Sequence, residues 1–159
     1  MGTRAPGGRG ADRDRDTRGA AIPLKTDLEF SDLRKGDTFA EFPLSVNADE
    51  VLAYLDATGE SAAIWTQHIP PLFLDALVVA ELLAQVKIPK GVMHTGQEHE
   101  AHRAARIDEV LTVRMGVAAL SEKRGVTLAA FEADLRDAAG EPVTTMRISV
   151  MVAPDGVTV

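Results

Sequence analysis

A long, almost entirely apolar stretch follows a pair of prolines, and it constrains the fold more than any other segment. Pro70 and Pro71 suit the first turn of a helix, where a missing backbone N–H costs little. Over residues 72–86 the few polar side chains fall on about a third of a helical wheel turning ~100° per residue. They are Asp75, Glu81 and Gln85. A helix this apolar has to be buried, and Pro89 and Gly91 are expected to end it.

One strand and one short helix are predicted before this long helix. Residues 38–46 alternate apolar and polar side chains with the period of two that a strand requires. Asn47 is a suitable helix N-cap, and Glu50, three residues later, completes a capping box. Gly59 is suited to the left-handed conformation that ends many helices. A short capped helix is therefore expected between Asn47 and Gly59.

Four further strands are predicted after the long helix. Alternating patterns place them at residues 92–103, 111–119, 127–135 and 146–152, with polar turns at 121–125 and 137–140. A sheet whose concave face wraps one apolar helix buries such a helix most simply. The expected fold class is therefore α+β: a single hotdog fold, with an antiparallel sheet around a long central helix.

Length and composition suit one domain and exclude several classes of function. The chain has 159 residues, no cysteine and a net charge of −7. Without cysteine there is no disulfide, zinc ribbon, iron–sulfur cluster or thiol nucleophile. Residues 1–21 carry a net charge of +2, so the remainder carries −9. An acidic body lacks the clustered cations of a nucleic-acid surface, so no nucleic-acid partner is expected.

The chain divides into a leader and one domain. Residues 1–21 are rich in Gly, Arg and Asp without apolar periodicity, and they are expected to be disordered. The hotdog domain is expected over residues 28–155. No apolar run is long enough to span a bilayer, and no secretory signal follows the N-terminal arginines. We therefore expect a cytoplasmic protein without a membrane partner.

Four segments carry a resemblance to a known family. They are residues 54–60 (YLDATGE), 69–73 (IPPLF), 94–98 (HTGQE) and 108–113 (DEVLTV). Together they resemble the MaoC-like hotdog dehydratases, which include the (R)-specific enoyl-CoA hydratases, over about residues 30–153. The resemblance implies an acyl-CoA or acyl-carrier-protein thioester as the ligand and no further cofactor. It also implies a homodimer or a heterodimer, because the thioester site of this family lies at the seam between two hotdog sheets.

The sequence departs from this family at the catalytic motif. In active members an Asp and a His in the pattern G-D-x-N-P-x-H handle the water and its proton, and a backbone N–H at the start of the central helix polarises the thioester carbonyl. Here Glu60 stands at the Asp position and Trp65 at the His position, where an indole is no base. Pro71, which has no N–H, stands at the position of the donor.

These departures resemble the dyad-less, N-terminal dehydratase-like half of paired family members. The resemblance implies a catalytically degenerate subunit of an enoyl-thioester hydratase or 3-hydroxyacyl-thioester dehydratase. Its partner would be a hotdog chain with an intact Asp/His motif. The residues expected to contact the thioester are Trp65, Pro71, Leu72, Phe73 and Gln97. Gln97 is expected either to form a hydrogen bond across the dimer seam or to be a polar residue of the surface.

Two alternatives remain open at the level of sequence. A stand-alone enzyme would use Glu60 with His68 for hydration, or Asp75 or Glu81 as the water-activating carboxylate of a thioesterase. For both helix carboxylates, however, the simpler expectation is a polar strip that faces solvent or a subunit interface. The third class is a structural or regulatory hotdog dimer that does not bind acyl-CoA.

Three histidines near residues 94–102 raise the question of a metal site. Along a strand His99 faces the side opposite to Glu98, Glu100 and His102, so these side chains diverge. No zinc-finger or H-E-x-x-H spacing is present. Solvated strand residues and no metal are therefore expected.

Overall fold

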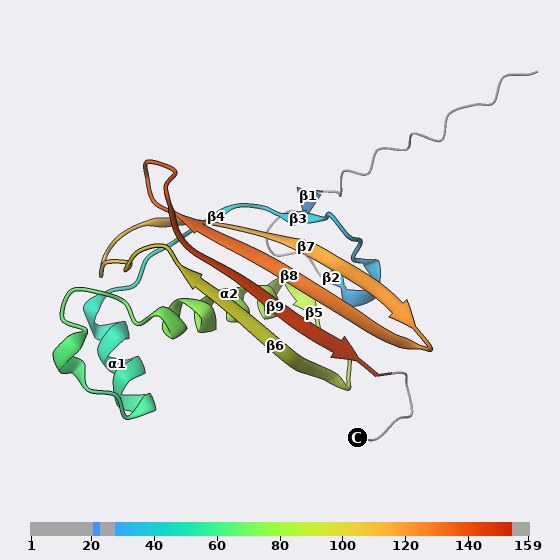
Figure 1. Cartoon of the computed structure of the whole chain (residues 1–159), viewed down its shortest axis with the longest axis horizontal. Coiled ribbons are helices and arrows are strands. Elements are labelled where there is room, and N and C mark those ends of the chain that lie inside the picture. The colour runs from blue at the N-terminus through green and yellow to red at the C-terminus, as the bar shows by residue number, and fades with distance from the viewer. Residues whose placement is uncertain (1–20, 23–27, 154–159) are drawn as a thin grey trace, which may run out of the picture.

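The structure is a computed structural model that describes residues 21–22 and 28–153 (Figure 1). The expected leader lies outside the described residues, apart from Ala21. The expected C-terminal domain boundary at 155 lies outside them as well. Ala21–Ile22 form strand β1, which pairs in parallel with β3 (Thr38–Phe39). The sheet thus begins before residue 28, where the sequence predicted the domain to start.

A seven-stranded sheet forms the body of the protein. Its order is β1-β3-β7-β8-β9-β6, and β4 also pairs with β7. The remaining members are β4 (Phe42–Leu44), β6 (Val92–Ala101), β7 (Leu111–Lys123), β8 (Val126–Arg136) and β9 (Pro142–Val152). The four long strands after the central helix are antiparallel, as predicted, and β6 lies at one edge of the described sheet with β9 as its neighbour.

The strand predicted over residues 38–46 is divided in two. Thr38 of β3 pairs with Gly116, whereas Phe42 of β4 pairs with Val113. Residues 38 and 42 are four positions apart, whereas their partners on β7, residues 116 and 113, are three positions apart. The register therefore shifts by one residue between β3 and β4. An alternating pattern of side chains does not reveal such a shift, and the prediction of one continuous strand is wrong.

The short helix α1 (Ala48–Thr58) has the ends that the sequence predicts. Asn47 Oδ1 accepts a hydrogen bond from the N–H of Glu50 at 3.0 Å, and Glu50 Oε2 accepts one from the N–H of Asn47 at 2.8 Å. Gly59 ends the helix with a φ of 72°, a conformation that costs glycine little. Two short 3₁₀ helices, η1 (Phe30–Asp32) and η2 (Ala62–Ile64), are the other helical segments of the described chain.

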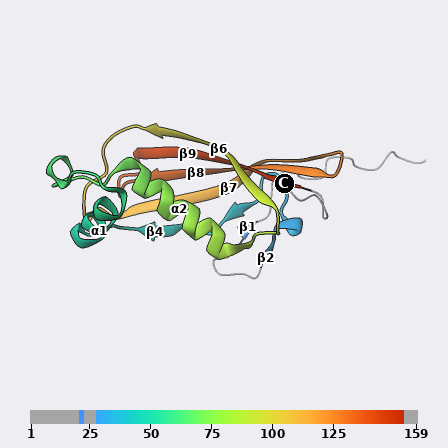
Figure 2. The same cartoon turned by 90° about the horizontal axis from the view of Figure 1, so that it is seen from below.

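The central helix α2 (Pro71–Gln85) crosses one face of the sheet (Figure 2). It turns Leu74, Val78 and Leu82 into the core, where each is at most 3% exposed. The helix ends four residues before Pro89 because the chain changes to strand β5 (Val86–Lys87), which pairs with β2 (Leu28–Glu29). The prediction that Pro89 and Gly91 end the helix is therefore wrong.

The outer side of α2 remains apolar and uncovered in the single chain. Leu72 is 63% exposed and Leu83 is 55% exposed, while the polar side chains of Asp75 and Gln85 are buried. The sequence predicted that the apolar residues of α2 are buried and that its polar residues form an outward strip. For one chain this prediction is wrong. We call Leu72, Ala76, Val79 and Leu83 the α2 stripe, because their spacing places them on one helical face.

The buried amide of Gln85 provides a test of packing at the end of α2. Gln85 is 2% exposed, and neither its Nε2 nor its Oε1 has a hydrogen-bond partner among the described residues. Because such a group costs free energy when buried, Gln85→Met should raise the free energy of unfolding by about 1 kcal/mol in urea titrations. The exposed Gln67→Met should change it by less than about 0.5 kcal/mol. A destabilised Gln85→Met would mean that bound water satisfies the amide.

None of the helices in the described part of the chain combines the length and the apolar character needed to cross a membrane.

Candidate functional site

Glu60 and His68 lie on separate segments and are not joined. Glu60 follows the end of α1, where its backbone N–H donates to the Leu55 carbonyl at 3.0 Å and its side chain is exposed. His68 is half-buried and forms an isolated antiparallel bridge with Arg106. Within residues 28–153 no hydrogen bond or ion pair connects the two side chains. The structure therefore shows no direct interaction between Glu60 and His68, and their catalytic pairing stays a prediction.

Trp65 and the start of α2 are the next predicted site positions along the chain. Trp65 follows η2 and packs half-buried against the core, with its Nε1 enclosed and without a partner among the described residues. Pro71 is the first residue of α2, so this helix start has one N–H donor fewer than usual. Phe73 is half-buried, and its N–H donates to the Pro70 carbonyl at 3.0 Å.

The structure assembles a polar cluster that the sequence did not predict. Asp75, whose side chain is 4% exposed, points from α2 toward the edge strand β6. Its Oδ1 lies 2.8 Å from Nδ1 of His99, and its Oδ2 accepts a hydrogen bond from Gln97 Nε2 at 2.8 Å. The expectation that Asp75 faces solvent or an interface is wrong, whereas Glu81 is exposed. Gln97 bonds within its own chain.

The two hydrogen bonds to Asp75 determine how His99 can act. An ionised carboxylate only accepts hydrogen bonds, so the ring proton of neutral His99 is assigned to Nδ1 and the lone pair to Nε2. Nε2 is enclosed and has no hydrogen-bond partner among the described residues. The cluster therefore leaves one basic nitrogen unused, next to a carboxylate that fixes the ring.

A pocket of about 430 Å³ lies beside this cluster, between α2 and β6. Its helix side is formed by Leu72, Ala76 and Val79 of the α2 stripe, and its strand side by His94, Gln97 and His99. One wall is thus apolar and the other polar, a combination typical of small-molecule sites. Two of the residues predicted to contact a thioester, Leu72 and Gln97, line this pocket.

Tyr54 connects this cluster electrostatically with the segment around Glu60. Its ring stacks on Phe73 with centroids 4.5 Å apart and 17° between the planes. Burial raises the pKa of Tyr54, and the negative charges of Glu60 and then Asp75 raise that pKa further. The carboxylates of Glu60 and Asp75 therefore both disfavour ionisation of the same phenol.

The two faces of β6 differ as the alternation predicts. Glu98 and Glu100 are exposed, and His102, just past the strand, has its Nε2 2.9 Å from Thr145 Oγ1. The expectation of solvated side chains is wrong for His99, whose side chain is 19% exposed. Nowhere in the described part of the chain do three or more His, Asp or Glu side chains gather as a metal ion would require.

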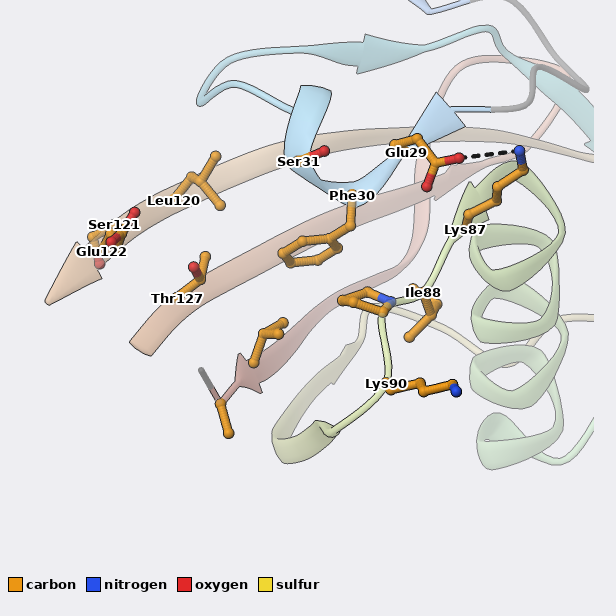
Figure 3. Close-up of a pocket in the computed structure, with 13 residues that line it drawn as sticks. Glu29, Phe30, Ser31, Lys87, Ile88, Lys90, Leu120, Ser121, Glu122 and Thr127 are labelled. Atoms are coloured by element: carbon orange, nitrogen blue, oxygen red, sulfur yellow. Dashed lines mark hydrogen bonds and ion pairs between the residues drawn. The ribbon is translucent and has the colours of Figure 1, made fainter. Parts of the chain in front are cut away.

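A larger hollow of about 610 Å³ lies elsewhere, beside η1 and β5 (Figure 3). Phe30, Ile88 and Leu120 supply apolar walls, and Lys87 and Lys90 supply positive charge. Glu29 forms an exposed ion pair with Lys87 at 3.1 Å. None of the residues predicted to be functional lines this hollow, and it holds no acid/base pair like that of the smaller pocket.

The Asp75–His99 pair escaped prediction although two signals pointed to it. Asp75 interrupts an apolar helix, and the alternation of β6 separates His99 from its charged neighbours. Taken alone, each signal is equally well explained by a side chain that faces solvent. Only the packing of β6 against α2, which brings together residues 24 positions apart, turns them into a cluster.

One family model matches most of the chain. The model of the family "FAS1-like, dehydratase domain region" matches residues 34–146. No curated protein is similar enough in sequence to match.

Solved structures show the same fold at low sequence identity. The R-hydratase PhaJ1 of Pseudomonas aeruginosa superposes with a TM-score of 0.63 at 18% identity, covering 81% of this chain and 88% of that one. The HadBC 3R-hydroxyacyl-ACP dehydratase complex of Mycobacterium tuberculosis gives 0.61 at 17%, covering 80% and 99%. The ChsH1–ChsH2 complex of the same organism gives 0.58 at 12%, covering 72% and 94%. These similarities confirm the predicted hotdog fold.

Proposed function

Since the chain belongs to the FAS1-like dehydratase-domain family, we propose that it is an acyl-thioester-binding subunit of a hotdog hydratase or dehydratase. In this proposal the acid/base dyad of the working enzyme lies on a second hotdog chain. The ligand is an enoyl or 3-hydroxyacyl group carried as a thioester on CoA or on an acyl carrier protein.

One observation carries the proposal: the dyad positions of this chain hold no acid/base pair. Glu60 is exposed and has no hydrogen bond to His68, and the resemblance places Trp65 where active members have their histidine. The same resemblance places Pro71, which has no N–H, where active members have the donor that polarises the thioester carbonyl. A chain that keeps the fold but lacks these groups would depend on a partner for the proton transfers of hydration or dehydration.

The surface around α2 and β6 favours a second hotdog chain as that partner. The α2 stripe leaves large apolar side chains exposed, and β6, beside it, has one neighbouring strand in the described sheet. A sheet edge next to an uncovered apolar helix face is covered when a second sheet pairs along the edge. Two of the structurally similar proteins, HadBC and ChsH1–ChsH2, are themselves complexes of two named components.

The proposal is tested by following hydration of crotonyl-CoA through the loss of enoyl absorbance. The purified chain alone is expected to give no turnover above buffer. Turnover should appear when the chain is co-expressed with a hotdog protein of its organism that carries the intact G-D-x-N-P-x-H motif. It should disappear again when the motif histidine of that partner is replaced by alanine.

Turnover by the chain alone would contradict the proposal. If Glu60→Gln and His68→Ala then abolished that turnover, the stand-alone hydratase would be the correct reading. If no partner produced turnover and no acyl-CoA bound in calorimetry, the structural or regulatory dimer would take its place.

A further inference from the structure

We propose that His99 is the acid–base residue of a thioester-hydrolysing site in the pocket between α2 and β6, with Asp75 as its positioning residue. This inference shares with the proposed function only the binding of an acyl thioester. It requires neither the dyad of a partner chain nor any hydration of a double bond.

The hydrogen bonds around Asp75 show which group can accept a proton. Both carboxylate oxygens already receive a donor, from His99 Nδ1 and from Gln97 Nε2, each at 2.8 Å. A carboxylate held in this way orients the imidazole and stabilises its positive charge once a proton is taken up. Proton transfer therefore falls to Nε2 of His99.

Nε2, unpartnered within the part of the chain that the structure describes, is the atom of His99 to which a further molecule would bind. It is enclosed and has no hydrogen-bond partner among the described residues, which costs about 1–3 kcal/mol for a buried polar atom. A water molecule or ligand group admitted between α2 and β6 would satisfy it. Since His99 lines the pocket there, that molecule would lie beside the space open to a substrate.

The two walls of the pocket suit an acyl thioester. Leu72, Ala76 and Val79 present apolar surface to an acyl chain, while His94 and Gln97 lie opposite them on β6. A volume of about 430 Å³ accommodates a short to medium acyl group together with one water. The occupant we infer is therefore an aliphatic acyl thioester with its reactive carbon near His99.

The reaction balances without a further reagent. Nε2 takes a proton from water as the water oxygen bonds to the thioester carbonyl carbon. The tetrahedral adduct collapses with cleavage of the carbon–sulfur bond, and the proton on the imidazolium passes to the departing sulfur. The products are a carboxylic acid and a free thiol, and His99 returns to its initial state.

The chain offers an unusually clean assay because it contains no cysteine. With the chain alone a thiol reagent therefore reports only CoA released from butyryl-, hexanoyl- or decanoyl-CoA, and with a partner the signal of the partner without substrate is subtracted. Hydrolysis above buffer is expected for the chain alone or with its hotdog partner. His99→Gln should lower kcat/KM by about 100-fold or more. His102→Gln, at the exposed neighbour bonded to Thr145, should leave kcat/KM within about two-fold as the matched control.

Two further measurements separate catalysis from folding. Ala76→Trp, on the exposed side of α2, should fill the pocket and reduce hydrolysis while leaving the Asp75–His99 pair intact. Long-range ¹H–¹⁵N spectra should show His99 protonated at Nδ1, and Asp75→Asn should move part of the population to the Nε2–H tautomer. If the hydrogen bond between Asp75 and His99 had only a structural role, Asp75→Asn would change the tautomer of His99 without changing the rate of thiol release.

The proposal is overturned if no thiol appears with any of the three substrates, alone or in the complex. It is equally overturned if His99→Gln releases thiol as fast as the unaltered chain. Hydrolysis is measured as thiol released from saturated acyl-CoAs, which cannot be hydrated, and hydration is measured as enoyl absorbance lost without release of thiol, so each reaction is followed separately. The failure of this inference is therefore distinguishable from failure of the proposed function.

Discussion

Leu83→Glu should weaken association with a second hotdog chain by at least about 100-fold, which corresponds to about 2.7 kcal/mol. Leu83 is 55% exposed in the single chain and lies on the α2 stripe with Leu72, Ala76 and Val79. A partner that covers this stripe buries an apolar side chain at position 83. A carboxylate placed there would lose its hydration without gaining a counter-ion.

Leu52→Glu is the matched control for this experiment. Leu52 is 52% exposed but belongs to α1, outside the α2 stripe. Sedimentation velocity should find the unaltered chain and Leu52→Glu associated, either with themselves or with the co-expressed partner, and Leu83→Glu monomeric. If Leu52→Glu dissociated the complex and Leu83→Glu did not, the docking face would lie on α1 instead.

The parts of the fold that depend on local interactions could be predicted from the sequence. The capping box of Asn47 and Glu50, the glycine that ends α1 and the four long strands each depend on residues a few positions apart. The end of α2 could not be predicted in the same way. It depends on β5 pairing with β2, two short strands 58 residues apart in sequence.

The candidate site was harder to predict because a helical wheel does not say which face is the inner one. Asp75 and Glu81 were expected outside because they are charged; Glu81 is exposed, but Asp75 is buried, as is the polar Gln85. Leu72 and Leu83 were expected inside because they are apolar, and both are exposed. In a chain built to meet a partner, the apolar surface of a helix divides between its own sheet and that partner. The few polar positions can then lie at the boundary between them.

A second large effect is expected at Arg103, which holds the loop between β6 and β7. Its guanidinium donates to both carboxylate oxygens of Glu109 and to Asp137 Oδ2 at 3.0 Å. The same loop carries Ala105 and Ile107, which bond to the backbone of residues 67–69. Arg103 therefore fixes the loop that supports the segment containing His68.

The ionisation of Glu109 makes this contribution depend on pH. Hydrogen bonds from Arg103 are the main cause that lowers the pKa of Glu109 below its ordinary value, and the pKa of Arg103 is raised in return. Because the folded-state pKa of Glu109 is lower than that of the unfolded chain, its contribution is complete above the unfolded value of about 4.3. The contribution is lost as the pH falls through the folded-state pKa.

Arg103→Met should therefore lower the free energy of unfolding at pH 7 by about 2 kcal/mol, a figure reduced for the 36% exposure of the arginine side chain. The melting temperature should fall by about 4–8 °C, and this difference should shrink as the pH is lowered toward 3. Arg114→Met, which breaks the exposed pair with Glu41 at 2.7 Å, should cost less than about 1 kcal/mol. Equal losses for the two variants, or a loss at Arg103 that does not depend on pH, would show that the arginine stabilises the loop by packing alone.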